Sequence, residues 1–262
     1  MGVLNVTPDS FSDGGRFATA HAAFAQAQVM IDAGADLIDI GGESTRPGSL
    51  PVAADEQIKR VVPVIKGIAA FPVTISIDTT RAAVAAAALD AGAALVNDIS
   101  AGRDDAEMLP LIARRRVPVV LMHMQGTPLT MQDAPHYRDV VAETSQFLRE
   151  RVAAAQAAGI ELAKVLLDPG IGFGKTQEHS LELLRRQREF LALGRPMVIG
   201  TSRKGFIGRI TGEPEPAKRL FGTAASVALS IANGAAIVRV HDVGPMVQVV
   251  RMTRAILEQT TN

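Results

Sequence analysis

The sequence contains no cysteine among its 262 residues. This absence excludes disulfide bonds, thiolate zinc sites and thiol nucleophiles. It also fits a reducing compartment, and we expect the cytoplasm. The chain begins MGVLNVTPDS, which has neither the basic start nor the long apolar stretch of a secretory signal.

A net charge and a long apolar run are also lacking. Lys plus Arg and Asp plus Glu both total 27, so the formal net charge is zero. A neutral chain gives no support to a general affinity for nucleic acid or for an anionic membrane, and we expect neither partner. No apolar stretch approaches the roughly 18 residues that cross a bilayer. An anionic ligand must therefore be bound by a local cluster of cations.

Short apolar runs that are rich in β-branched residues recur along the chain. Most of them do not alternate with polar residues, which is typical of parallel strands that are buried on both faces. The expected strands are Gly2–Val6, Leu37–Ile40, Val73–Ile77, Ala94–Asn97, Val117–Met122, Val165–Leu167, Met197–Gly200 and Ala236–Val240.

Longer amphipathic segments separate these runs. Val61, Ile65 and Ile68, for example, have the spacing of a helix that faces a core. Several joints from helix to strand contain a glycine, which can end a helix in the left-handed conformation. These joints begin at Ala33, Ala91 and Asn233. Eight βα units without a linker predict an α/β protein, a single (β/α)₈ TIM barrel that forms one domain over residues 1–262. A doubly wound open sheet is the alternative.

Polar side chains stand where most of the apolar runs stop. In either fold, ligands bind beyond the C-terminal ends of the strands. The polar residues at these ends are Asn5, Asp78, Asn97, His123, Asp168, Ser202, Lys204, Arg239 and His241. Asp39 also lies near the end of a run, but the segment DIGGEST could turn it toward a helix, so we leave it out of the site. The convergence of so many strand ends predicts one binding site.

Each of these residues alone has an ordinary structural explanation. Asp78 could cap the helix that follows it. His123, between two methionines, is more simply explained as a buried core histidine. Arg203 and Lys204 could be a solvated pair. Only the fact that they meet at one end of the barrel favours a functional role.

The carboxylates and the amide at these ends are suited to a flat heterocycle. A carboxylate such as Asp78 or Asp168 can accept hydrogen bonds from an exocyclic amine and an adjacent ring N–H together. The amide of Asn97 can donate and accept at once, and Lys204 can donate to a ring carbonyl or nitrogen. This set indicates recognition of an amino-pyrimidinone edge, which guanine and pterin share.

A second group of residues is suited to an anion. Arg239 and His241 are two apart at the end of the eighth run, so their side chains leave on the same face. Arg46 is a further cation. Asn5 offers a neutral oxygen, and magnesium commonly takes few protein ligands besides water and substrate phosphate. We therefore expect a phosphorylated substrate with Mg²⁺. No Asp-rich cage or His/Cys set indicates a tightly held transition metal.

Two segments, Thr7–Arg16 and Gly41–Pro51, are rich in Gly, Pro, Ser and Asp. Such loops at the mouth of a barrel can close over a substrate and exclude water. Plain surface turns are the alternative.

Eight motifs in order resemble those of the dihydropteroate synthase family, and the match spans nearly the whole chain. They are NVTPDSFSDGG at Asn5, IDIGGESTRPG at Ile38, SIDTT at Ser76, NDISAG at Asn97, LMHMQGTP at Leu121, DPGIGFGK at Asp168, SRKGFIG at Ser202 and RVHDV at Arg239.

This resemblance implies a role for each matching residue. Asn5 corresponds to the Mg²⁺ ligand, and Arg239 and His241 correspond to the pair that binds the diphosphate. The positions that hold the pterin ring are Asp78, Asn97, Asp168 and Lys204. Apolar residues near that pocket, which could also be ordinary core, are Met122 and Phe173. The p-aminobenzoate site and the catalytic loops are matched by Thr45, Arg46, Pro47 and Ser202. The residues expected to take part in catalysis are Asp78, Asp168, Lys204 and Arg46.

The resemblance also implies the reaction. The family joins 6-hydroxymethyl-7,8-dihydropterin diphosphate to p-aminobenzoate, by an SN1-like route, and releases pyrophosphate and dihydropteroate. Sulfonamides mimic p-aminobenzoate in this family, and homodimers are usual. Two departures stand out: family members usually carry a segment before the first strand, and Ser180 replaces a frequent Asn.

Two other functions remain open. A methyltransferase of the methyltetrahydrofolate:corrinoid type would share the Asp and Asn contacts to a pterin, but it needs no binding site for a diphosphate. A non-catalytic pterin-binding paralogue would not need the intact set that includes Asn5, Lys204 and His241.

Overall fold

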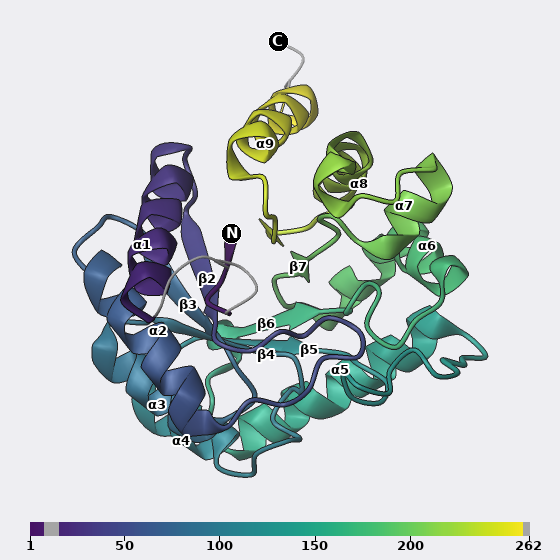
Figure 1. The fold of residues 1–262 in the computed structure, drawn as a ribbon. Helices are drawn as coiled ribbons and strands as arrows, with labels where there is room; N and C mark the ends of the chain where they lie inside the picture. Colours follow the sequence, from purple (N-terminus) through teal and green to yellow (C-terminus); the bar gives the residue numbers. More distant parts are fainter. Residues whose placement is uncertain (8–15, 259–262) are drawn as a thin grey trace.

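The computed structural model describes residues 1–7 and 16–258, in which eight short strands are each followed by helical structure (Figure 1). The strands are β1 Gly2–Asn5, β2 Leu37–Gly41, β3 Thr74–Asp78, β4 Leu95–Asp98, β5 Val119–Met122, β6 Val165–Asp168, β7 Val198–Ile199 and β8 Ile237–Val238. The α-helices are α1 Arg16–Asp32, α2 Ala54–Ile68, α3 Ala82–Ala91, α4 Met108–Arg115, α5 Val140–Ala157, α6 Gln177–Arg185, α7 Gly205–Thr211, α8 Leu220–Ala232 and α9 Val243–Leu257. Short 3-10 helices are η2 Leu162–Lys164, η3 Gln187–Leu193 and η4 Pro216–Lys218. A strand is present at each of the eight expected positions.

The strands close into a barrel. β1 to β6 form a parallel sheet in chain order, and β7 pairs with β8 in parallel. Isolated bridges join these two sheets at both seams, Leu167 with Met197 and Gly2 with Val240. At the second seam the Val3 N–H donates to the Val240 carbonyl over 2.9 Å. The closed circle of strands confirms the (β/α)₈ prediction and excludes the doubly wound open sheet.

The last two strands are shorter than expected from the sequence. The N–H groups of Ala236 and Ile237 both donate to the carbonyl of Met197, over 2.9 and 3.1 Å. Two donors on one acceptor interrupt the even spacing of a parallel ladder. The regular part is therefore only two residues long in each strand.

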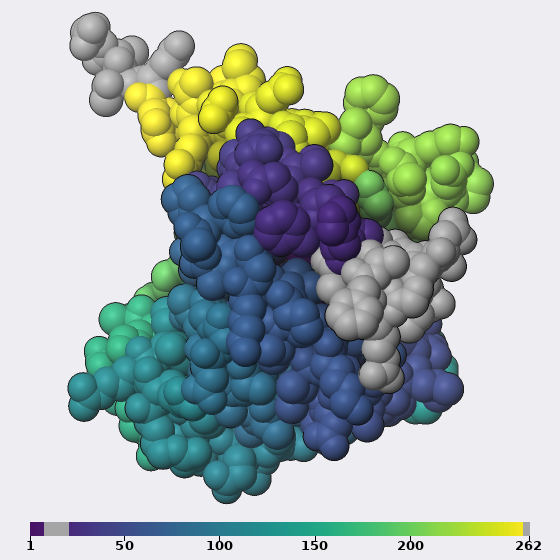
Figure 2. Space-filling view, turned by 60° about the vertical axis from the view of Figure 1, so that its left-hand side comes forward, coloured from purple at the N-terminus to yellow at the C-terminus, as the bar shows by residue number. Residues whose placement is uncertain are grey.

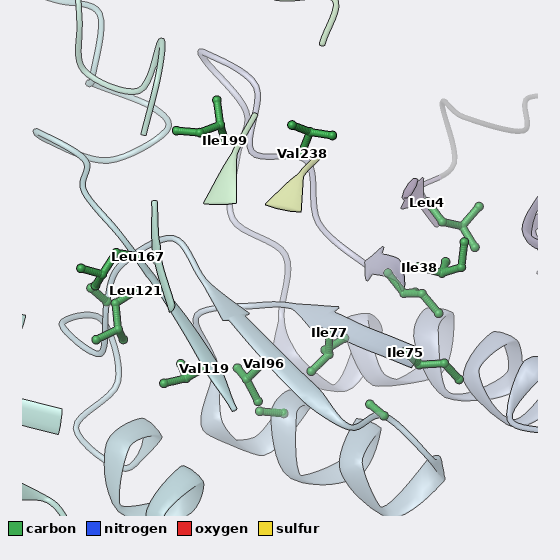
Figure 3. Close-up of a cluster of buried hydrophobic side chains, with 14 of the residues drawn as sticks. Leu4, Ile38, Ile75, Ile77, Val96, Val119, Leu121, Leu167, Ile199 and Val238 are labelled. Carbon is green, nitrogen blue, oxygen red and sulfur yellow. The ribbon is translucent and has the colours of Figure 1, made fainter. Parts of the chain in front are cut away.

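The side chains of the strands divide into two sets, because successive residues of a strand point to opposite faces. One set, which includes Leu4, Ile38 and Ile77, packs outward against the helices in the main core (Figure 3). The other set points into the barrel. Its lower members form a separate apolar cluster made of Met1, Leu95, Val120 and Val198, with Leu37, Leu166 and Ile237 beside them. The upper members of the inward set carry the polar groups.

Glycines at the helix-to-strand joints have the expected conformation. The φ angles are 93° at Gly34, 121° at Gly92 and 90° at Gly234. Only glycine adopts this region without strain, so each helix can end where the chain turns into the next strand.

The layer of helices closes as well. In the space-filling view, the last helix, in yellow, lies against the first, in purple (Figure 2). A Cβ atom at Gly34 would lie 3.6 Å from Val247 of α9, which places the end of α1 directly beside that helix. Among the helices of the described ranges, none is long and apolar enough to cross a membrane.

Candidate active site

The register of the sheet brings distant polar residues into one row. Asn5 of β1 pairs with Gly41 of β2, Gly41 with Asp78 of β3, and Asp78 with Asn97 of β4. On the far side of the barrel, Met122 pairs with Asp168. These residues share the inward face at the carboxyl ends of their strands, which is where the sequence predicted the site.

A cavity opens above this row. It is lined by Val3, Thr45, Asp78, Asn97, Ile99, Met122, Asp168, Phe173, Gly200, Ser202, Lys204, Arg239 and His241. All but three of these, Val3, Ile99 and Gly200, belong to the predicted site. The cavity thus joins the residues expected to bind a heterocycle with those expected to bind an anion.

One wall of the cavity is apolar. Met122 and Ile99 pack together with Met124 and Met131, and Phe173 packs against this cluster. The two predicted apolar residues therefore line the cavity as well as filling a small core. A flat ring could lie against this wall while its edge meets the polar groups.

Asp78 is held by a cation from the opposite side of the barrel. Arg239 Nη2 lies 2.7 Å from Asp78 Oδ2, and Arg239 Nε lies 2.6 Å from Asp39 Oδ2. Asp78 does not cap the helix after it: the N–H of Ala82 at the start of α3 donates to Asp105 instead. The capping explanation for Asp78 is therefore wrong.

Asp39, which we left out of the predicted site, does not turn toward a helix. It is fully buried beneath the cavity, and its Oδ2 also accepts a hydrogen bond of 2.9 Å from Asn97 Nδ2. Its position two residues after Leu37 places it on the inward face of β2, because side chains alternate along a strand. This alternation was the signal that could have identified it.

The second carboxylate, Asp168, is fixed by the loop after β6. Its Oδ1 accepts a hydrogen bond of 2.7 Å from the N–H of Gly170. Burial raises the pKa of Asp168, while the nearby Lys204 ammonium opposes this rise. Burial also raises the pKa of Asp78 to about 7, against the effect of Arg239. Both carboxyls are costly to ionise, so a ligand with N–H donors would stabilise the charged form.

Lys204 is not part of a solvated pair. Its Nζ donates to the Ile171 carbonyl and lies 4.8 Å from the centre of the Phe173 ring. Burial lowers the pKa of Lys204 to about 8, and Asp168 opposes this shift. Its neighbour Arg203 is bound to Asp242 through two hydrogen bonds of 2.5 and 3.0 Å.

Ser202 and His241 connect the loops after β7 and β8. Ser202 Oγ accepts a hydrogen bond of 3.1 Å from the backbone N–H of His241 and lies 3.0 Å from its Nδ1. Burial and the charge of Arg239 lower the pKa of His241 to about 4, so the ring is neutral at pH 7. The Ser202 hydroxyl can donate to Nδ1, which leaves the ring proton on Nε2 as a donor toward an anion.

The Gly41–Pro51 segment contributes one residue to the cavity. Thr45 lines it, whereas Arg46 and Pro47 are exposed and lie outside the lining. The N–H of Gly48 donates to the Pro128 carbonyl over 3.0 Å, which attaches the segment to the loop after β5. In the other predicted lid, Thr7–Arg16, residues 8–15 lie outside the described residues. The closing movement of both lids stays a prediction.

His123 does not line the cavity and is a buried core histidine, as the sequence suggested. It is buried, its ring packs edge-on against Phe147 at 4.8 Å, and burial lowers its pKa to about 2. Lys175, which sequence reasoning missed, lies 2.8 Å from His123 Nδ1 and also donates to the Phe173 carbonyl over 3.0 Å. This buried lysine holds the loop that carries Phe173. The motif DPGIGFGK contains Lys175, but the motif does not indicate where the side chain of this lysine points.

Asn5 fits a magnesium ion only if a ligand supplies most of the coordination. Within residues 1–7 and 16–258, no group of three His, Asp or Glu side chains is arranged to hold a metal. A Cβ atom placed at Gly41 would lie 3.6 Å from Asn5 Oδ1 and equally far from Asp78 Cβ, so the amide oxygen lies beside the row that holds Asp78, although Asn5 does not itself line the cavity. One neutral oxygen would suit Mg²⁺ if a ligand and water supplied the other oxygens.

Comparisons with known proteins agree over almost the whole chain. The family described as pterin binding enzyme matches residues 1–241. A dihydropteroate synthase of Synechocystis sp. is 47% identical over 257 residues, which cover 98% of this chain and 89% of that protein. Two structures of Xanthomonas albilineans dihydropteroate synthase are also similar. The one with 4-aminobenzoic acid has a TM-score of 0.94 at 45% identity and covers 99% and 93% of the two chains. The one in complex with 7,8-dihydropteroate has a TM-score of 0.90 at 42% identity and covers 99% and 94%.

Proposed function

The chain belongs to the pterin-binding enzyme family and, within it, to the dihydropteroate synthases, and we propose that the cavity at its strand ends is where it performs the reaction of that family. It is a transferase that joins 6-hydroxymethyl-7,8-dihydropterin diphosphate to p-aminobenzoate and releases pyrophosphate and 7,8-dihydropteroate. One observation supports the proposal most strongly. Side chains suited to a ring and side chains suited to an anion come from different strands and line the same cavity.

We assign the pterin ring to the side of the cavity between Asp78 and Asp168. The two carboxylates accept hydrogen bonds from the ring and exocyclic N–H groups, and Lys204 donates to a ring acceptor. The face of the ring lies against Met122 and Phe173. What supports this orientation is the apolar wall beside the buried acids.

The diphosphate is assigned to the side formed by Arg239 and His241. Arg239 has guanidinium donors beyond the two that bind the acids, and the neutral ring of His241 can donate from Nε2. Thr45 and Ser202, which line the same cavity, supply hydroxyl groups. Because the chain has no net charge, an anion has to be bound by a local cluster of donors, and these residues form one.

Asn5 would hold Mg²⁺ together with oxygens of the diphosphate. When bound, the ion neutralises the charge that develops on the leaving group. A single amide ligand would not hold the ion tightly, so the diphosphate would have to supply most of the remaining ligands besides water.

The reaction breaks the bond between the methylene carbon of the pterin and the diphosphate oxygen. The bonding electrons leave with pyrophosphate, and the carbon becomes positive and is stabilised by the electron-rich dihydropterin. Asp78 and Asp168 stabilise this cation as preorganised carboxylates in a buried site. The arylamine nitrogen then attacks the carbon and loses one proton. Because an arylamine is neutral at pH 7, this step needs no strong base.

We place p-aminobenzoate beneath the Gly41–Pro51 segment, near Thr45 and Ser202. Arg46 and Pro47, which are exposed, would reach it on closure of the segment. We also propose that residues 1–262 act as one domain and that the chain forms a homodimer in the cytoplasm. Light scattering of the purified protein tests the dimer.

The experiment that tests the function measures pyrophosphate release from dihydropterin diphosphate with and without p-aminobenzoate. We expect release that depends on p-aminobenzoate and a matching amount of dihydropteroate. A corrinoid-dependent methyltransferase or a non-catalytic paralogue would release none, and that result would reject the proposal.

A further inference from the structure

We propose that Asp39 is a positioning residue, which sets the hydrogen-bonding direction of Asn97 and anchors Arg239. This inference rests on the proposed function and adds a residue that does not itself line the cavity. Asp39 lies two residues below Gly41 on β2, and thus one inward layer beneath the row that holds Asp78 and Asn97.

Two side chains of the site share one oxygen of Asp39. Asn97 Nδ2 donates to Oδ2 over 2.9 Å, and Arg239 Nε donates to the same atom over 2.6 Å. These residues come from β4 and from the end of β8, on either side of β2 around the barrel. A single carboxylate therefore fixes a neutral side chain and a cation of the site from below.

The contact with Asp39 decides which end of the Asn97 amide faces the cavity. A carboxylate only accepts hydrogen bonds, so Asn97 must turn its NH₂ group down toward Asp39. Its carbonyl oxygen is then the atom available to a ligand. Asn97 consequently offers an acceptor to a ring N–H, like Asp78 and Asp168, while one of its two N–H groups stays bound to Asp39.

Asp39 also limits the movement of Arg239. With Nε bound to Asp39 and Nη2 bound to Asp78, the guanidinium is held in one orientation. Arg239 also lines the cavity. A cation fixed in this way is preorganised for the anion, so binding does not have to restrict a long side chain.

The burial of Asp39 is not explained by stability alone. Its side chain is completely inaccessible, and its Oδ1 has no hydrogen-bond partner among the described residues. A buried charge with an unsatisfied oxygen is costly, and apolar side chains of similar volume are often at least as stable. A positioning role accounts for a carboxylate at this place.

The test compares Asp39→Leu, Asp39→Asn and the control Asp36→Asn, which changes an exposed carboxylate just before the same strand. Leucine removes the acceptor, and we expect the KM for dihydropterin diphosphate to rise about 10- to 100-fold, the loss typical of a hydrogen bond to a charged group. The KM for p-aminobenzoate should stay unchanged. Asparagine keeps an oxygen for both donors and should restore most of the pterin KM.

Three results would overturn the inference: an unchanged pterin KM in Asp39→Leu, an equal rise in both KM values, or no recovery in Asp39→Asn. If Asp39→Leu does not fold, the wild-type protein labelled with ¹⁵N at asparagine decides the matter. The side-chain NH₂ hydrogens of Asn97 should be protected from exchange both before and after the pterin binds. Rapid exchange in the free protein would contradict the inference. Inactivity of the wild-type protein would instead reject the proposed function.

Discussion

Arg239 Nη2 lies 2.7 Å from Asp78 Oδ2, so a cation at the end of β8 binds the carboxylate at the end of β3 from 161 residues away in the chain. Burial raises the pKa of Asp78 to about 7 although Arg239 opposes the shift. Between its ordinary pKa near 3.8 and about 7, the folded chain therefore holds a proton on Asp78 that the unfolded chain has lost. The contribution of Asp78 to stability accordingly falls as the pH rises through this window.

This pKa predicts proton release on pterin binding. The ring N–H groups need the ionised carboxylate, so at pH 6 binding should release about one proton per site. Calorimetry in two buffers with different ionisation enthalpies measures this number. Asp78→Asn should reduce the release. The same release from Asp78→Asn as from the wild type would assign the proton to another group.

Asp168→Asn should weaken pterin binding and turnover together. The loss of one preorganised charge typically costs on the order of 3 kcal/mol, or about a hundredfold in rate. Asp90→Asn is the matched control, because Asp90 is a largely exposed carboxylate that pairs with Arg115 outside the site. Calorimetry gives the affinity and steady-state kinetics give the rate. A variant with wild-type affinity for the pterin would remove Asp168 from the ring site.

Magnesium should bind measurably only together with a diphosphate. Asn5 is a single neutral ligand, so Mg²⁺ titrated into the chain alone should give no heat of binding, whereas Mg²⁺ with pyrophosphate should. Asn5→Ala should raise the Mg²⁺ concentration for half-maximal activity on the order of tenfold, the scale of losing one contact at a metal site. Equal Mg²⁺ dependence in both proteins would exclude Asn5 as a ligand.

Gly170→Ala should destabilise the chain more than Gly194→Ala. Both glycines have positive φ angles, 66° and 64°. The Cβ atom at Gly194 meets nothing within 4 Å, whereas at Gly170 it would lie 1.9 Å from the His123 carbonyl oxygen. In Gly194→Ala the positive φ angle alone should lower the free energy of unfolding by about 1 kcal/mol. Denaturant unfolding measures both free energies, and equal values would contradict the close contact. Only Gly170→Ala should also weaken pterin binding, since the Gly170 N–H holds Asp168.

The alternation of side chains explains why much of the site was predictable. Asn5, Asp78, Asn97 and Asp168 end apolar runs, and parallel strands in register bring such ends together whatever the sequence between them. The barrel followed from the same runs, because strands buried on both faces need helices around them. The last two strands were expected too long, and one carbonyl there receives two donors. The first strand was expected to end one residue later, and the fifth to begin two residues earlier, than they do.

The partners within the site were not predictable from local pattern. Asp39 becomes a tolerable buried acid only beside Arg239, 200 residues later in the chain. Lys175 likewise has its partner, His123, at the end of another strand. Arg46 and Pro47 are exposed and lie outside the lining of the cavity, so their approach to a substrate stays a prediction.

One cavity should hold the pterin ring beside its diphosphate. A crystal structure of the chain with dihydropterin diphosphate and Mg²⁺ would show both groups at once. We predict the ring edge within hydrogen-bonding distance of Asp78, Asn97 and Asp168, and the diphosphate against Arg239 and His241. A ring bound elsewhere, or a diphosphate that contacts neither Arg239 nor His241, would rule out this arrangement.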